Sequence, residues 1–168
     1  MPDPHVEPRL LAGRVGRPHG LDGSFHVAAG RPALLALGAA VSVAGHRRQI
    51  VRRAGTDRQP IIRLDECQSR SDAEALRGAE LWTLRSEAPP LAEDEWWAEE
   101  LEGCQVHDRG REVGVVRRLL AAPSCDVLEV RRADGGELLV PMVRDALRAV
   151  DVGTRRIEID LGFVAPDE

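Results

Sequence analysis

Residues 13–27, GRVGRPHGLDGSFHV, join two short apolar runs, 10–15 and 24–28, through a turn rich in glycine and proline. Short apolar runs separated by such turns are typical of β-strands. Similar runs follow in the first half of the chain at residues 41–43, 49–53, 61–64 and 81–84. Several short strands at this spacing predict a small β-barrel rather than alternating β-α-β units.

One helix is predicted in the first half of the chain. Residues 71–74, Ser-Asp-Ala-Glu, have the S-x-x-E form of a capping box, which marks the start of a helix. Residues 75–77 continue the helix, and Gly78 supplies a stop.

A connector and a second β-rich half follow. Residues 86–95, SEAPPLAEDE, contain Pro89 and Pro90 and predict a stiff acidic linker. The remaining strand candidates are residues 103–107, 113–120, 127–131, 137–140, 146–150 and 156–160. The predicted fold class is therefore all-β, with two small β-barrels joined by a short linker and one short helix.

Composition excludes several classes of protein. The chain has 168 residues, of which 43% are hydrophobic and 30% charged, and this balance supports a packed core. No apolar run approaches the ~18–20 residues of a membrane helix, and residues 1–8 lack the pattern of a secretory signal. The three cysteines are far apart, which argues against a disulfide framework or a zinc site. We expect a cytoplasmic protein with no metal and no cofactor.

The charge is unevenly distributed between the two halves. The formal net charge is −5, and all 23 basic residues are arginine. Residues 1–87 hold 13 arginines against 10 acidic residues, a net of +3, and residues 88–168 hold 10 against 18, a net of −8. A basic module tethered to an acidic one predicts two different partners, although small domains also differ in charge by chance.

The glycine-rich segment, residues 13–23, is the first candidate site. Arginines beside exposed backbone amides can hold phosphate oxygens, and glycines allow close approach to a partner. The segment is neither a P-loop nor a dinucleotide fingerprint, and an ordinary glycine-rich turn is the alternative. His19 and His26 have no recognisable nucleophile or metal ligands around them, which favours structural histidines over catalysis.

Trp96 and Trp97 form the second candidate site. They are two of only five aromatic residues in the chain, and acidic residues surround them. Indole rings are favoured as interface anchors, so the pair predicts a partner contact. The alternative is that the rings fill the seam between the two modules, and both hold if one ring points inward and the other outward.

Three segments in order, residues 13–27, 69–81 (SRSDAEALRGAEL) and 90–97 (PLAEDEWW), resemble the bacterial ribosome maturation factor RimM family. Residues 103–162, with DRGREVGVV, SCDVLEV and ELLVP, are similar to the PRC-barrel that forms the C-terminal half of that family. The resemblance spans roughly residues 9–163. It implies a translation-factor-like six-stranded barrel over 9–85, a linker over 86–98 and a PRC-barrel over 99–163.

The resemblance also implies a function. Members of the family bind the head of the immature 30S subunit and promote 16S rRNA processing and folding without catalysis. Their contacts are with head ribosomal protein number nineteen and with rRNA, and we expect this chain to act as a monomer. A PRC-barrel adaptor and a nucleotide-dependent rRNA-modifying enzyme built on the glycine-rich loop are the alternatives.

Site residues follow from the same resemblance. The subunit-binding or rRNA-binding loop maps onto Arg14, Gly16, Arg17, Pro18, His19, Gly20 and Gly23. The aromatic pair that binds the ribosomal protein maps onto Trp96 and Trp97, where the family commonly has two tyrosines. Stacking and burial survive that change, whereas a phenol hydrogen bond does not. The expected phosphate contacts use some of Arg14, Arg17, Arg31, Arg47, Arg48, Arg52 and Arg53.

Overall fold

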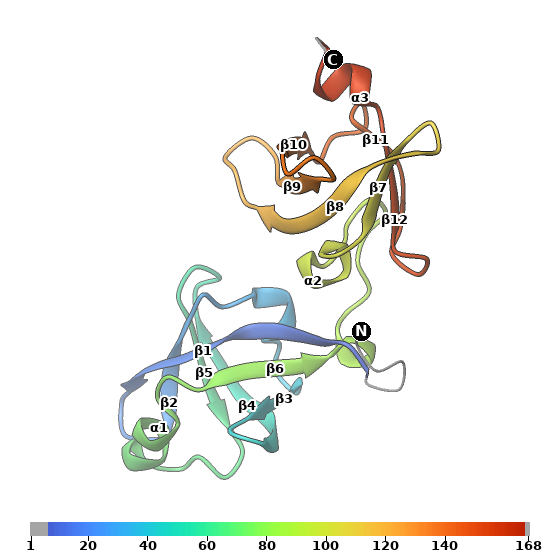
Figure 1. The fold of residues 1–168 in the computed structure, drawn as a ribbon. Helices are drawn as coiled ribbons and strands as arrows, with labels where there is room; N and C mark the ends of the chain where they lie inside the picture. Colours follow the sequence, from blue (N-terminus) through green and yellow to red (C-terminus); the bar gives the residue numbers. More distant parts are fainter. Residues whose placement is uncertain (1–6, 167–168) are drawn as a thin grey trace. The chain divides into compact units, whose positions relative to one another are not determined.

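The structure, a computed structural model that describes residues 7–166, is mostly β (Figure 1). Two compact units divide the chain, Met1–Pro90 and Leu91–Glu168. The absence of a secretory signal was inferred partly from residues 1–6, which lie outside the described residues. Because residues 88–90 are Ala-Pro-Pro, this division keeps the charges of +3 and −8 on separate units.

The first unit is a closed six-stranded barrel, as predicted. Its strands pair in the order β1-β2-β5-β4-β3-β6, and β6 pairs back with β1. Pro60, Ile62 and Leu64 of β5 are buried, and the residues between them are less so, as expected for a strand with one face toward a core. The elements are β1 (Arg9–His19), β2 (Ser24–Ala28), β3 (Ala40–Val43), β4 (His46–Gly55), β5 (Pro60–Leu64), β6 (Glu80–Leu84), α1 (Arg70–Leu76) and the 3₁₀ turns Pro32–Leu34 and Arg85–Glu87.

Strand β1 is longer than the sequence suggests. The predicted strand ends at residue 15, but β1 continues to His19, and the turn occupies only residues 20–23. The register between β1 and β2 shifts between Val15 and Pro18, and such an irregularity accommodates a proline that has no N–H to donate. Most of the glycine-rich segment is therefore strand.

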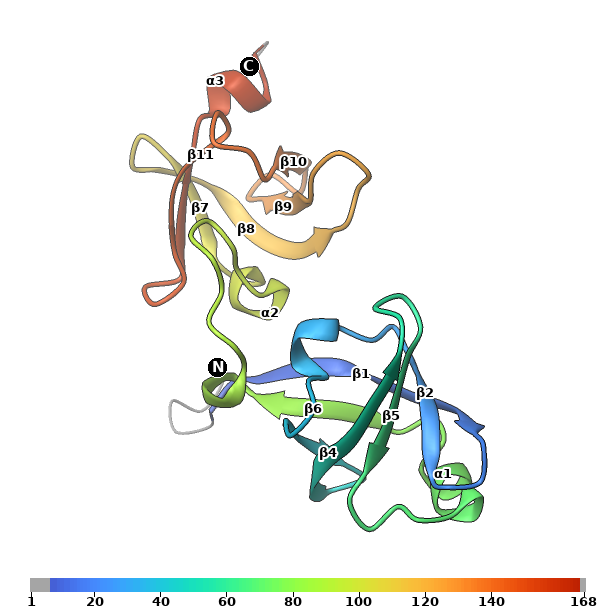
Figure 2. The same ribbon diagram turned by 180° about the vertical axis from the view of Figure 1, so that it is seen from behind.

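Helix α1 is present, but its capping box begins two residues earlier than predicted. The N-cap is Ser69, whose hydroxyl accepts from the backbone N–H of Asp72 at 3.2 Å. The Asp72 carboxylate in turn accepts from the Ser69 N–H at 2.9 Å. Aspartate closes the box here in place of glutamate, so Ser71 and Glu74 lie inside the helix. The helix packs against β1 and β2 at one end of the barrel (Figure 2).

The second unit is a six-stranded sheet that curls into a half-barrel. Its order is β10-β9-β8-β7-β12-β11, and all neighbours are antiparallel except β7 and β12. Leu101 of α2 and Cys104 join the buried residues of the strands in one core. The elements are α2 (Ala98–Leu101), β7 (Gln105–Asp108), β8 (Arg111–Leu120), β9 (Val127–Arg132), β10 (Glu137–Pro141), β11 (Leu147–Asp151), β12 (Arg156–Ile159) and α3 (Leu161–Val164).

Candidate functional site

Three glycines of the predicted loop determine its shape. A side chain on Gly16 would place its Cβ 2.8 Å from the carbonyl oxygen of His26, so only glycine lets β1 and β2 approach there. Gly23, at φ +85°, is buried against the backbone of Cys67, whose thiol donates to the Gly23 carbonyl oxygen. Gly20, at φ +69°, lies in the turn. These positions are explained by backbone geometry.

The side chains of Arg17 and His19 in the loop are accessible, whereas that of Pro18 is not. Arg17, His19 and Gly20 are exposed, and Pro18 is buried between the strands. Arg14 is also exposed, but its guanidinium pairs with the Glu80 carboxylate at 2.8 Å. Arg17 and His19 are therefore the loop side chains open to a partner.

Most of the other arginines expected to bind phosphate are already engaged within the barrel. Arg31 donates to the carbonyl oxygen of Leu11 at 3.1 Å. Ion pairs hold the remaining four, Arg47 with Glu87, Arg48 with Glu66, Arg52 with Asp22 and Arg53 with Asp57. A phosphate group would have to displace a carboxylate from each of these pairs.

Arg17 differs, because it lines a cavity of about 290 Å³ together with Arg58 and His26. Neither arginine forms an ion pair with a described residue. Arg58 was missed from the sequence because it lies about forty residues away in the turn between β4 and β5. Only the pairing of β2 with both β1 and β5 brings the two arginines together.

His26 lines this cavity and contacts the ring of a second histidine, His19. The rings of His19 and His26 meet edge to face, with centroids 5.2 Å apart and planes at 84°. Burial lowers the pKa of His26, and the neighbouring Arg17 and His19 lower it further. His26 is therefore neutral at pH 7, in a region where positive charge is not compensated.

The two tryptophans have different environments. Trp97 is only 6% exposed and is the residue directly before α2, where its backbone N–H donates to the Glu100 carboxylate. Trp96 is partly buried and packs against the core of the second unit. Trp96 also lines a groove.

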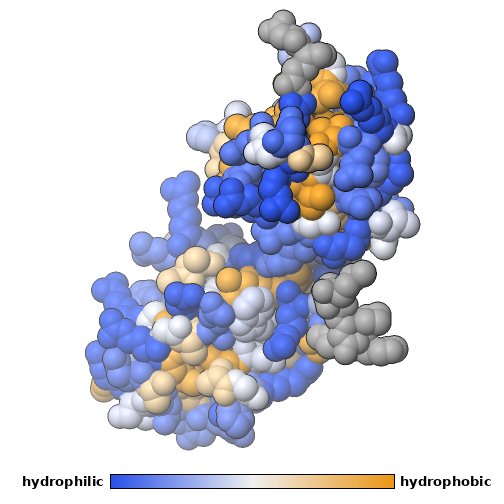
Figure 3. Space-filling view, viewed as in Figure 1, coloured by the Kyte–Doolittle hydropathy of each residue, from blue (hydrophilic) through white to orange (hydrophobic). Residues whose placement is uncertain are grey.

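That groove, the Trp96 groove, has a volume of about 760 Å³. Its apolar lining comes from Trp96, Met142, Val143, Leu147, Ala149 and Val150, and its charged lining from Glu93, Asp94, Arg144 and Arg148. Apolar side chains reach the surface of this unit between hydrophilic ones (Figure 3). An apolar floor with a charged rim is the usual anatomy of a protein-protein interface.

The charged rim of the Trp96 groove is partly neutralised by ion pairs. Arg144 donates to Asp94 at 2.8 Å, and Arg148 donates to Asp160 at 2.5 Å. The pKa of Asp160 is lowered, chiefly by the hydrogen bond from Arg148. Glu93 forms no ion pair with a described residue.

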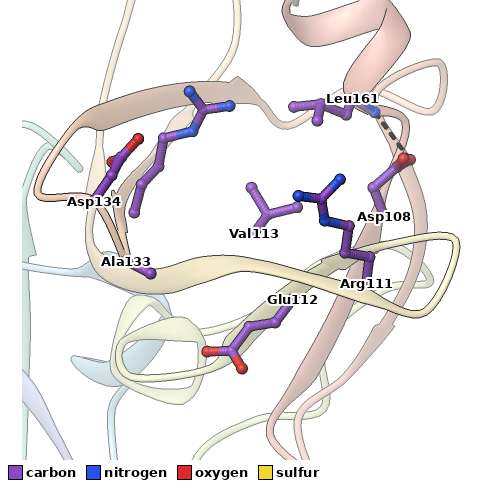
Figure 4. A pocket seen from close by; sticks show the side chains of 8 residues that line it. Asp108, Arg111, Glu112, Val113, Ala133, Asp134 and Leu161 are labelled. Carbon is purple, nitrogen blue, oxygen red and sulfur yellow. Dashed lines mark hydrogen bonds between the residues drawn. The ribbon is translucent and has the colours of Figure 1, made fainter.

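A second cavity in this unit, of about 420 Å³, contains none of the predicted site residues (Figure 4). Leu161 and Val113 line it, and Arg111 points its guanidinium into it beside Val113. The Asp108 carboxylate accepts from the backbone N–H of Leu161 at 3.2 Å, which ties α3 to β7.

Residues 7–166 contain neither a metal-ion cluster nor a membrane-spanning helix. No three His, Cys, Asp or Glu side chains in that range are placed to hold a metal ion. No helix among the described residues is long and apolar enough to cross a membrane.

Comparison with known proteins places this geometry in a family. Residues 10–88 match the model of the RimM N-terminal domain, and residues 98–162 match that of the RimM PRC barrel domain. Ribosome maturation factor RimM of Cutibacterium acnes is 36% identical over 157 residues, which cover 89% of this chain and 87% of that protein. The chain belongs to the RimM family.

Further RimM proteins support the same assignment. The protein from Frankia alni is 34% identical over 167 residues, covering 90% of this chain and 93% of its own length. The match to RimM of Chloroflexus aurantiacus is 39% identical over 100 residues but spans only 58% of that protein. The glycine-rich loop lies inside the RimM N-terminal domain, and Trp96 and Trp97 directly precede the PRC barrel domain.

Proposed function

We propose that this chain is a non-enzymatic maturation factor that binds the head of the immature 30S subunit and promotes 16S rRNA processing and folding. Its protein partner is head ribosomal protein number nineteen, and it works as a monomer without a cofactor. The site of action is the cytoplasm, where bacterial ribosomal subunits are assembled. The observation that carries this proposal is the Trp96 groove on the acidic unit of a RimM-family chain.

The acidic unit that carries the groove suits a basic ribosomal protein. A tryptophan that is partly buried at the edge of an apolar groove can anchor a partner, because covering it removes a large apolar area from water. The surrounding half of the chain carries a net charge of −8. Opposite potentials speed and orient the encounter with a cationic partner.

The basic unit supplies the second contact, with rRNA. Its net charge is +3, and the exposed side chains of Arg17 and His19 lie on one end of β1. Arginine forks bind phosphate oxygens in pairs, so this end of the barrel favours an RNA backbone. The basic unit thus binds rRNA and the acidic unit binds a ribosomal protein of the same immature subunit.

Trp96→Ala is expected to weaken binding to immature 30S subunits. Removing an interface aromatic anchor costs roughly 1–3 kcal/mol, which corresponds to about fivefold to 150-fold in Kd. Co-sedimentation of the full chain with purified immature subunits, over a range of protein concentrations, measures this change.

A matched control separates the groove from the rest of the surface. Leu139 on β10 is 51% exposed and does not line the groove, so Leu139→Ala also removes an accessible apolar side chain from the same unit. It is expected to bind as the wild type does. Unchanged binding by a folded Trp96→Ala variant would show that the groove is not the subunit-binding site. Equal losses in both variants would show that the loss does not depend on the groove.

A further inference from the structure

Arg17 and Arg58 converge on the same cavity from different parts of the barrel. Arg17 comes from β1, and Arg58 comes from the turn between β4 and β5. Strand β2 lies between these segments and contributes His26, Val27 and Ala28 to the cavity. Three adjoining segments of one closed barrel therefore build the site.

The positive charge of this pair is not compensated within the described part of the chain. Among the described residues of the unit, ion pairs hold seven other arginines, Arg14, Arg47, Arg48, Arg52, Arg53, Arg63 and Arg77. Arg17 and Arg58 form none with a described residue. The acidic neighbour Asp57 accepts from Arg53 at 3.2 Å instead.

The walls of the cavity suit a compact anion. Its volume is about 290 Å³, and Val27, Ala28, Ala29 and Gln59 complete the lining. Ala29 in the wall has φ +49°, a left-handed conformation that alanine rarely adopts. Strain of this kind persists where the surrounding structure holds it, and it clusters at ligand sites.

We propose that Arg17 and Arg58 form a phosphate-binding pocket that takes the sugar-phosphate backbone of RNA. This inference rests on the proposed function and specifies where the N-terminal unit touches RNA. Each guanidinium presents a planar set of N–H donors that matches phosphate oxygens, and arginine keeps its charge at any physiological pH. The neutral imidazole of His26 offers a further hydrogen-bonding group without a carboxylate to compete for the arginines.

The test compares two double variants with the same change in charge. Arg17→Ala with Arg58→Ala removes both arginines of the pocket, whereas Arg9→Ala with Arg77→Ala removes two exposed arginines that do not line it. The probe is a transcript of the 16S rRNA head domain, and binding is measured by filter retention at several salt concentrations. Thermal unfolding of each variant verifies the fold.

The pocket variant is expected to lose roughly tenfold in affinity per arginine. The slope of log K against log salt should fall by about 1.4–1.8, because each phosphate contact contributes ~0.7–0.9. The control variant should show a much smaller change in both the RNA affinity and the salt slope. Equal losses in the two double variants, or unchanged binding by the pocket variant, would overturn the proposal.

A second arm distinguishes RNA from free phosphate. Inorganic phosphate is titrated into the wild-type protein while the imidazole resonances of His19 and His26 are followed by NMR. Resonance shifts that saturate in the wild type and are absent from the pocket variant support the pocket. Phosphate binding without RNA binding would overturn the assignment to RNA. If the pocket variant binds RNA as the wild type does, the pocket proposal fails, but subunit binding through Trp96 is unaffected. If the wild-type protein does not bind immature 30S subunits at all, the proposed function itself is refuted.

Discussion

Replacing Trp97 with alanine is expected to destabilise the folded protein by about 3–5 kcal/mol, the usual cost of truncating a large buried aromatic side chain. Trp97 is 6% exposed, and its backbone leads directly into α2, which places Leu101 in the core. Loss of the indole leaves a cavity, and we expect the backbone at the start of the four-residue helix α2 to relax too little to fill it. Urea unfolding followed by circular dichroism measures the change in the free energy of unfolding.

Two further variants show whether burial is the cause. Trp97→Phe keeps most of the apolar volume and should recover much of the stability. Trp96→Ala removes a partly buried ring and should destabilise the unit less than Trp97→Ala does. A loss below about 1 kcal/mol for Trp97→Ala would contradict the burial of this side chain.

Gly23→Ala is expected to destabilise the N-terminal barrel strongly. Gly23 has φ +85°, and a residue with a side chain held in that region is strained by about 1–3 kcal/mol. The new Cβ would also overlap the backbone carbonyl of Cys67, which cannot move without disturbing the segment between β5 and α1. Urea unfolding should therefore show a loss above the strain alone.

Gly38→Ala is the matched control for this effect. Gly38 has φ +84°, but no atom lies within 4 Å of an added Cβ. This variant should lose only the conformational part, and the difference between the two variants measures the overlap with Cys67. Equal losses of unfolding free energy in the two variants would show that the close approach of Gly23 to Cys67 does not contribute to the effect.

Most of the fold could be predicted because it depends on local patterns. Short apolar runs between turns located the twelve strands of the described residues, and α1 was found from a capping box and a following glycine. The four-residue helices α2 and α3 were not predicted. The errors were local too. Pro18 suggested a turn where a register shift keeps it inside β1, and the Ser69–Asp72 box lies two residues before the predicted one.

The site could be predicted only in part, because its details depend on distant residues. The aromatic pair stands out in the sequence, but the burial that separates Trp97 from Trp96 depends on tertiary packing. Arg14 and Glu80 are sixty-six residues apart, so no local pattern shows that this arginine is already paired. The cavity with Arg58 likewise exists only because the barrel brings β1, β2 and β5 together.

Site-directed crosslinking from position 96 tests the proposed partner most directly. A photoreactive benzoylphenylalanine replaces Trp96 in the full chain, the protein is irradiated with immature 30S subunits, and the products are identified by mass spectrometry. The expected result is a covalent product with head ribosomal protein number nineteen that is absent when the photoreactive group replaces Leu139 instead. Crosslinks confined to proteins of the large subunit, or to small-subunit proteins outside the head, would contradict the proposal.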